Sequence, residues 1–280
     1  MSNGAEIVKK RNSAVPLSYG KARVRYRSYV SEMGAGTFVP LLIIMIWQLG
    51  GTVGWISQEF LPAPFTIVKA LFALLASGEL IHHLGVSIGR AGLGFLAGGL
   101  LGLLLGIATG LFRKLEYMLD PSIQVLRLVP HLAIAPLIIL WFGFGEASKI
   151  AIIISGSLFP MYINTFIGIR QADHKWIEVG KVLGFSSWQK FRRVIFPASL
   201  PHILLGVRLS MAVAWIGLVV AELIGSNSGV GFLINEAKQN SNTEIIFVGI
   251  LIFAVVGKLI DSFMKIVERK LLSWRDSYQG

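Results

Sequence analysis

Residues 178–197 read EVGKVLGFSSWQKFRRVIFP and form a polar stretch between two strongly apolar segments. Three basic residues, Lys190, Arg192 and Arg193, lie close together within it. Each flanking segment is near the length of about 20 residues that a helix needs to cross a bilayer. A loop that only joined two crossings could be a handful of residues. We therefore expect this stretch to fold outside the bilayer and to bind a partner there.

The composition places the chain among membrane proteins. Of its 280 residues, 54% are hydrophobic and 15% are charged, with a mean hydropathy of +0.68. Soluble domains carry about 25% charged residues. The net charge of +11 does not indicate nucleic-acid binding, because the basic residues fall in alternate gaps between the apolar runs. The chain has no cysteine, which excludes disulfides, thiolate metal sites and cysteine nucleophiles.

Six apolar stretches are candidates for membrane-spanning helices. They cover residues 38–56, 84–112, 123–144, 150–169, 201–224 and 245–267. A shorter amphipathic stretch, 64–77, is expected to form a helix that lies at the membrane surface. The pattern predicts an all-α polytopic protein with six transmembrane helices.

The distribution of arginine and lysine predicts the orientation. If the N-terminus is cytoplasmic, 20 of the 26 basic residues lie inside and three lie outside. Such an excess is the positive-inside signal. Both termini and the polar stretch are then cytoplasmic. Residues 1–37 show no secretory signal peptide, and we expect them to form a basic cytoplasmic arm that touches anionic membrane lipid.

Glycine recurs every four residues in the second predicted span, which places the glycines on one face of a helix. The residues are Gly94, Gly98, Gly102, Gly106 and Gly110. A face without side chains lets a second helix approach closely, and we expect tight helix packing there. A smooth surface of this kind would also allow sliding in a protein that moves.

Helix-ending signals divide the polar stretch into two short helices. Asp173 is a candidate N-cap, and Gly184 suits the break that follows the first helix. Ser186 and Gln189 have the spacing of a capping box for the second helix. Pro197 and Pro201 are expected to mark the re-entry into the membrane.

The same stretch resembles the signature loop of the permeases of binding-protein-dependent ABC importers. That signature has Glu-Ala-Ala, three residues, Gly, nine residues and Ile-x-Leu-Pro. Glu178, Gly184 and Pro197 are in register with it. Val179 and Gly180 stand in place of the two alanines, and Val194 and Phe196 in place of isoleucine and leucine; all four remain small or apolar.

The resemblance implies that residues 170–200, the coupling loop, dock on an ATPase subunit. The residues expected to carry this contact are Asp173, Trp176, Glu178, Gly180, Leu183, Gly184, Phe185 and Pro197. The chain has no Gly-Lys-Ser/Thr phosphate loop, so we expect no enzyme activity and no cofactor of its own, with ATP and Mg²⁺ held by the partner ATPases. The alternative is a surface helix that lies on lipid headgroups through Trp176 and Trp188.

A second resemblance narrows the family. Residues 126–133, LRLVPHLA, and 136–143, PLIILWFG, are similar to the third span of nitrate, taurine and sulfonate permeases. The Val-Pro-His version, the FPMYINT motif at 159–165 and AELI at 221–224 are most similar to the aliphatic sulfonate branch. The resemblance implies uptake of a small organic anion, with aliphatic sulfonates favoured over taurine, nitrate, bicarbonate or another small solute.

Several polar and aromatic residues in the spans are candidates for the translocation path. They are Arg90, Arg127, His131, Trp141, Asn164, Arg208 and Glu222. Ionisable groups at membrane depth usually face protein or water. Each residue also has a structural interpretation: Arg127 and Arg208 could reach the headgroups, His131 could bond a carbonyl, and Glu222 could pair with Arg90. The histidines are scattered, and no metal site is expected.

The resemblance implies the type I importer permease (MetI-like) fold in a bacterial inner membrane. We divide the chain into a tail (1–37), the first span with the periplasmic amphipathic segment (38–83), a core of five spans (84–268) and a cytoplasmic C-terminal tail (269–280). The expected partners are a second copy of the permease, two ABC ATPase subunits and a periplasmic solute-binding protein. An ion-coupled secondary transporter is the competing class, but its buried carboxylates are nearly absent from the spans. An integral membrane enzyme would need a polar catalytic cluster that the sequence does not provide.

Overall fold

The computed structural model describes residues 26–274, with side chains from residue 38 onward. Within these residues every regular element is helical. The chain divides into two compact units, residues 1–49 and 50–280. The described part of the first unit is the helix α2 (Tyr26–Val53) up to Leu49. The last turn of α2, from Gly50, belongs to the second unit. The N-terminal arm up to residue 25 lies outside the described residues.

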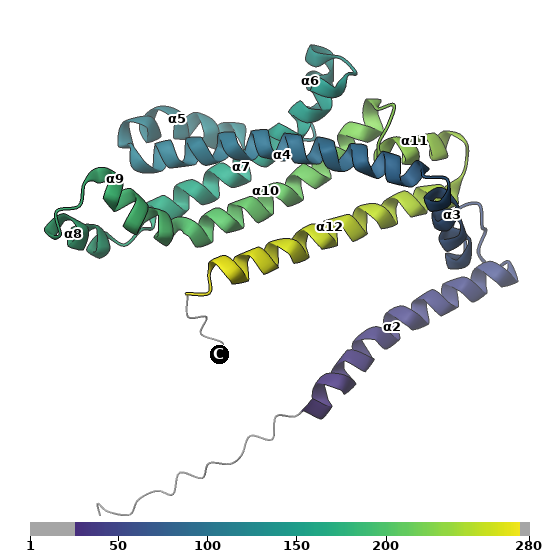
Figure 1. The fold of residues 1–280 in the computed structure, drawn as a ribbon. Helices are drawn as coiled ribbons and strands as arrows, with labels where there is room; N and C mark the ends of the chain where they lie inside the picture. Colours follow the sequence, from purple (N-terminus) through teal and green to yellow (C-terminus); the bar gives the residue numbers. More distant parts are fainter. Residues whose placement is uncertain (1–25, 275–280) are drawn as a thin grey trace, which may run out of the picture. The chain divides into compact units, whose positions relative to one another are not determined.

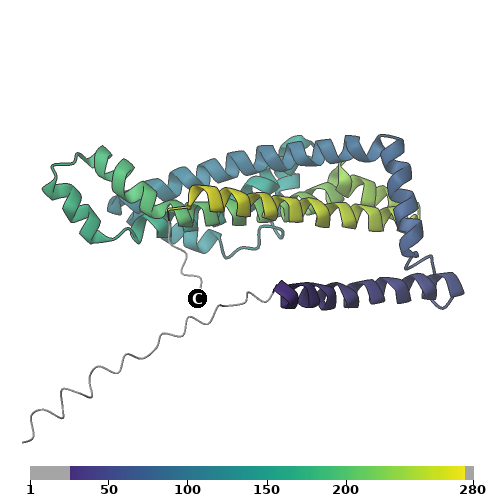
Figure 2. The ribbon, with the colours of Figure 1, turned by 60° about the horizontal axis from the view of Figure 1, so that its bottom comes forward.

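Three long helices form the centre of the second unit. α4 (Glu79–Leu111), α7 (Glu146–Arg170) and α10 (Phe196–Gly225) run side by side, and α12 (Thr243–Leu271) lies along them (Figures 1 and 2). Each is part of a helix that is long and apolar enough to cross a membrane. α12 buries the least, so much of its apolar surface is open to lipid or to another chain.

The glycine face of α4 lies directly against α7. A Cβ atom at Gly98 would come within 2.7 Å of the carbonyl oxygen of Ile154, and one at Gly102 within 2.4 Å of that of Leu158. Gly106 meets the Tyr162 carbonyl in the same way, whereas Gly94 and Gly110 meet the side chains of Ile153 and Ile169. Because backbone atoms cannot move aside as a flexible side chain can, a larger residue at Gly98, Gly102 or Gly106 would force the two helices apart.

The third predicted span, residues 123–144, is not one continuous helix. α5 (Arg113–Leu126) is followed by a non-helical segment, and α6 (Ala135–Phe142) begins one residue before Pro136. Pro130 has no N–H to donate, and it disfavours the helical conformation at the residue before it. Pro136 is in the first turn of α6, where the missing N–H costs nothing. The third predicted span is therefore interrupted where its two prolines lie.

The coupling loop lies at one end of the long helices and α11 (Val230–Gln239) lies at the other, near α3 (Pro64–Ala76) (Figures 1 and 2). The loop holds α8 (His174–Val182), α9 (Ser187–Lys190) and the π-helical turn η1 (Phe191–Ile195). The C-terminal end of α12 lies at the coupling-loop end.

Pro197 and Pro201, expected to mark the re-entry into the membrane, do not end a helix, because the helix runs without interruption from Ser187 to Gly225. Pro197 follows η1, whose wider hydrogen-bonding pattern accommodates a residue that lacks an N–H. The second helix of the coupling loop is thus continuous with the fifth span, and a movement of the loop would be carried directly into the membrane.

Candidate functional site

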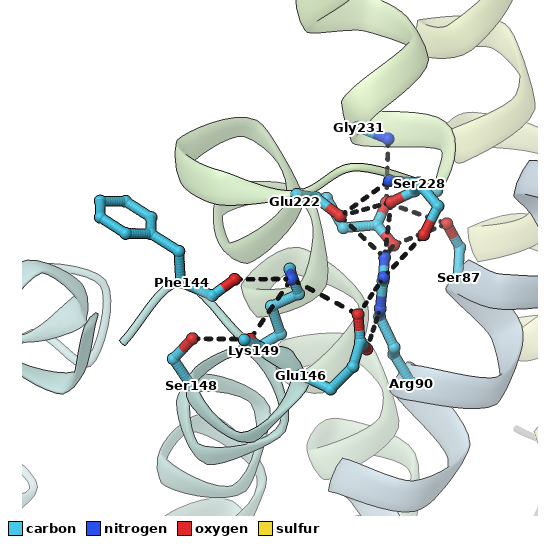
Figure 3. A network of polar contacts seen from close by, with 12 residues as sticks. Ser87, Arg90, Phe144, Glu146, Ser148, Lys149, Glu222, Ser228 and Gly231 are labelled. Atoms are coloured by element: carbon cyan, nitrogen blue, oxygen red, sulfur yellow. Dashed lines mark hydrogen bonds and ion pairs between the residues drawn. The ribbon is translucent and has the colours of Figure 1, made fainter. Parts of the chain in front are cut away.

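A network of charged side chains, buried except for Glu146, lies where α4, α7, α10 and the start of α11 meet (Figure 3). We call it the Arg90 cluster; it comprises Ser87, Arg90, Glu146, Lys149, Glu222, Ser226 and Ser228. Arg90 is 4% exposed. Its Nε and Nη2 donate to the two carboxylate oxygens of Glu146 at 2.6 and 2.5 Å, and its Nη1 donates to Glu222 at 2.8 Å.

The remaining donors of Arg90 bind the segment between α10 and α11. Nη1 donates to the Ser228 carbonyl at 2.6 Å and the Ser226 hydroxyl at 3.0 Å, and Nη2 donates to the Ser228 hydroxyl at 2.9 Å. Ser226 in turn donates to the Ser228 carbonyl. One guanidinium therefore fixes the end of α10, the following turn and the beginning of α7, using the fork of donors that only arginine provides.

Glu222 is fully buried, and each of its oxygens is hydrogen-bonded. Ser87 donates to both oxygens at 2.9 Å, and the backbone N–H of Gly231 donates to Oε2 at 2.9 Å. Gly229 has a φ of 108°, and a Cβ atom there would lie 2.2 Å from Glu222 Oε1. Only glycine fits between this carboxylate and the turn.

The cluster is electrically neutral. Arg90 and Lys149 carry two positive charges and Glu146 and Glu222 carry two negative ones, and Lys149 Nζ also donates to the carbonyls of Phe144 and Gly145 at 3.3 Å. Buried charges that are fully paired specify one arrangement of the helices, whereas removing one partner is strongly destabilising. This arrangement holds helix ends together and leaves no cation free for a solute.

Sequence reasoning placed Arg90 and Glu222 in the translocation path and suggested that the two could pair; the structure brings them together. It missed Glu146 and Lys149, because the predicted fourth span began at residue 150. The contacts join residues more than 50 positions apart, so no local pattern marks them. The helix α11 was also missed, although Val230, Leu233 and Ala237 have the spacing of a buried helix face.

The two caps predicted in the coupling loop are confirmed. The Asp173 side chain accepts from the backbone N–H of Lys175 at 2.9 Å. Ser186 and Gln189 form a complete capping box, with hydrogen bonds of 3.2 and 2.8 Å. Gly184 has a φ of 71°, so the chain reverses there between α8 and α9. The loop thus keeps its shape through its own hydrogen bonds.

The surface of the coupling loop exposes several large apolar side chains at a helix end, away from the long apolar helices. Val182 is 87% exposed, and Trp176 and Leu183 are also well exposed; Trp188 stacks on Phe191 with ring centres 5.6 Å apart. Gly180 is buried against Lys190 and Phe185, with room for a Cβ atom at 3.4 Å. Asp173, Trp176 and Pro197 line a small groove of about 220 Å³ with Trp274. Contiguous exposed apolar groups of this kind mark a binding surface.

The other predicted path residues do not gather in one place. His131 packs against Gly156 of α7, and its Nε2 is buried without a hydrogen-bond partner among the described residues. Asn164 donates to the carbonyl of Pro160 at 2.8 Å. Trp141 is 70% exposed, and Arg127 lies exposed at the end of α5. Their assignment to the path stays a prediction.

Arg208 lies between α10 and α12, where it donates from Nε and Nη2 to Asp261 Oδ1 at 2.9 and 2.6 Å. Glu268 lies 3.6 Å from Nη1. The guanidinium is therefore held by protein carboxylates rather than by headgroups alone. Within residues 26–274, no cluster of three or more His, Cys, Asp or Glu residues could hold a metal ion.

Comparison with known proteins agrees with these features. Residues 98–273 match the family described as "Binding-protein-dependent transport system inner membrane component". The chain belongs to this family. The permease is 57% identical over 245 residues to the "Putative aliphatic sulfonates transport permease protein SsuC" of Bacillus subtilis (strain 168), covering 88% of this chain and 89% of the relative. A protein of the same name from Escherichia coli (strain K12) is 46% identical over 241 residues, covering 86% of this chain and 92% of the relative.

The fold of the permease is also that of a solved importer. The chain described as "Crystal structure of an amino acid ABC transporter with histidines" aligns with a TM-score of 0.61 at 18% identity, covering 71% of this chain and 97% of that one. At this identity the likeness concerns the fold alone. The permease is a membrane-spanning subunit of an ABC importer, and its fold is the all-α type I permease fold.

Proposed function

We propose that the permease carries aliphatic sulfonates across the bacterial inner membrane, so that the cell can use them as a source of sulfur. The supporting observation is the similarity, over more than four fifths of the chain, to two permeases named for this cargo. Taurine, nitrate, bicarbonate or another small anion carried by the same machinery is the alternative cargo.

The energy for this transport comes from ATP that is hydrolysed, with Mg²⁺, on two partner ATPase subunits. The coupling loop suits such a docking site, because it combines exposed apolar side chains with a shape fixed by its own caps. Since α9 continues through η1 into α10, closure of the ATPases would move the fifth span as a lever. A soluble binding protein delivers the solute from the outer side.

The orientation follows from the charge count: both termini and the coupling loop face the cytoplasm, and the Arg90 cluster faces the periplasm. Two copies of the chain enclose the path. The broken third span and the open face of α10 are the surfaces that would face it, because Leu140, Trp141 and Ile216 remain exposed in a single chain.

A strain whose other sulfonate-uptake systems have been deleted, so that growth on a sulfonate depends on this importer, tests the cargo. We expect growth with ethanesulfonate as the only sulfur source, and no growth when the ATPase genes are absent. Growth on taurine alone, or nitrate uptake without ethanesulfonate uptake, would contradict the proposed cargo while leaving the importer class intact.

The docking of the ATPase is tested separately with Glu178→Arg, which reverses a charge on the exposed face of α8. We expect the variant permease to reach the membrane at the normal level but to lose the ATPase during purification. Glu236→Arg, an exposed reversal on α11 at the opposite end, is the matched control and should keep it. Equal recovery of the ATPase with both variants would argue against docking through this loop.

A further inference from the structure

The helix α11 begins without a cap of its own. Its N-cap position is Gly229, which has no side chain to accept a hydrogen bond, and its first turn contains no acidic residue. The first N–H groups of a helix have no partner within the helix, and when they are buried they must be satisfied by other groups. The caps of α11 therefore have to come from elsewhere in the chain.

Side chains of α4 and α10 accept hydrogen bonds from three consecutive N–H groups at the start of α11. The Gly229 N–H donates to His83 Nδ1 at 3.0 Å, and the Val230 N–H donates to Ser87 Oγ at 2.9 Å. The next N–H along the chain binds the buried carboxylate of the Arg90 cluster. His83 and Ser87 are four residues apart, so the same face of α4 holds the first two of these groups.

The hydrogen bond from Gly229 requires a neutral ring at His83. A ring nitrogen that accepts an N–H carries no proton, so the proton of the neutral imidazole is on Nε2. Protonation would turn Nδ1 into a donor that faces another donor. It would also place a positive charge at the N-terminus of α11, which is the positive end of the helix dipole.

The surroundings of the ring do not compensate a positive charge. His83 is 8% exposed and packs against Phe232 of α11, with ring centres 5.7 Å apart. The titratable groups that interact electrostatically with it are Glu79 and His82 of α4, Glu222 of α10 and Glu236 of α11. Glu222 is already paired with Arg90, and the other two carboxylates are exposed, where water weakens their attraction.

We propose that His83 is a pH-sensitive cap, which holds the start of α11 when its ring is neutral and releases it when the ring is protonated. Histidine changes its charge near pH 6.5, so the cap is complete above this pH and is lost as the pH falls below it. Under the proposed orientation the ring lies at the periplasmic end, where the pH of the medium acts. The cap does not depend on which solute is carried.

Release of the cap would loosen the outer end of α10. Gly229 directly follows Ser228, whose carbonyl and hydroxyl bind Arg90, so one short turn is held by both His83 and Arg90. If α10 carries the movement of the coupling loop, it can do so only while its far end is held. We therefore expect acid to lower transport through this contact.

The thermal transition of the detergent-solubilised permease at pH 7.5 and pH 5.5 tests the cap. Both values lie above the ordinary pKa of carboxylates, so histidines are the side chains that change charge between them. We expect the wild type to unfold about 4 °C lower at pH 5.5, the size expected for loss of one buried hydrogen bond. His83→Asn, whose Oδ1 takes the position of Nδ1 and does not titrate, should show no such fall.

Two further variants assign the fall to this ring. His82→Asn removes the exposed neighbouring imidazole and should keep the fall of the wild type. His83→Ala removes the acceptor at every pH, so at pH 7.5 it should already unfold at the lower temperature. Equal transitions of the wild type at the two pH values, or the same fall in His83→Asn as in the wild type, would overturn the proposal.

Uptake of ethanesulfonate by cells with the complete importer connects the cap to transport. The measured quantity is the fraction of the rate at pH 7.5 that remains at pH 5.5. The same binding protein serves both permeases, so its own pH dependence cancels when His83→Asn is compared with the wild type. We expect the fraction to be larger for His83→Asn. Equal fractions would overturn the role of the cap in controlling transport.

Discussion

The Arg90 cluster and the coupling loop lie at opposite ends of the same helices, and they are stabilised in opposite ways. In the cluster, the buried Arg90 joins carboxylates of α7 and α10 and the serines of one turn by hydrogen bonds between residues far apart in the sequence. In the loop, the caps join residues two or three positions apart, and the apolar side chains point outward.

The difference indicates which end is fixed and which end moves as a unit. Breaking one contact of the cluster would leave a buried charge unpaired, so the helix ends there resist separation. The loop depends little on its surroundings and can change position while it keeps its shape. A long helix, α10, joins the two regions, since it contains Glu222 and continues into η1 and α9.

The largest effect is expected from Glu222→Ala in the cluster. The substitution leaves Ser87 and the Gly231 N–H without their acceptor and Arg90 with a single carboxylate, at a cost of about 3–5 kcal/mol. The thermal transition of the detergent-solubilised protein should fall sharply. Glu236→Ala, on the exposed side of α11, is the control. Equal transition temperatures for the two variants would show that the cluster does not stabilise the helix ends.

A smaller loss of stability is expected from Gly102→Ala, which tests the glycine contact between the two regions. The new Cβ atom would meet the Leu158 carbonyl at 2.4 Å, and overpacking of this kind costs about 1–3 kcal/mol. Gly89→Ala on the same helix meets no atom within 4 Å and should be neutral or slightly stabilising. Thermal denaturation of both variants measures the difference. A stable Gly102→Ala protein would mean that α4 and α7 are not fixed at this distance.

The smallest change in stability is expected from Ser186→Ala in the coupling loop. Loss of the capping box should cost about 1 kcal/mol locally and leave global unfolding unchanged. Uptake should fall, because a frayed α9 transmits movement poorly. Ser186→Asp, which restores an N-cap acceptor, should recover uptake. Ser187→Ala, at the neighbouring residue, is the control and should leave uptake unchanged. A drop in the global transition equal to that of Glu222→Ala would remove the distinction between the two regions.

The sequence alone predicted the features that depend on neighbouring residues. Asp173, Ser186 and Gly184 marked the two helices of the coupling loop, because caps and turns are decided within a few residues. The four-residue repeat of glycine showed which face of α4 a neighbour would meet, but the spacing could not identify that neighbour as α7.

Features that depend on distant residues could not be predicted in the same way. The role of Glu146 requires knowing that the start of α7 lies beside Arg90, 56 positions earlier. The interruption of the third span, by contrast, is a local feature, because Pro130 and Pro136 each lack the N–H that a continuous helix would need. The re-entry expected at Pro197 took no account of the π-helical turn before it: this proline lies within the first turn of α10, so the helix continues through it.

Labelling of Val182→Cys with a membrane-impermeant maleimide tests most directly whether energy enters through the coupling loop. The natural chain has no cysteine, and Val182 is 87% exposed, so the introduced thiol is the only target. We predict labelling in inside-out vesicles but not in intact cells, and protection when the ATPase subunits are bound. Lys238→Cys on α11 should show the opposite sidedness. Labelling of Val182→Cys from outside, or labelling that the ATPases do not reduce, would contradict the account.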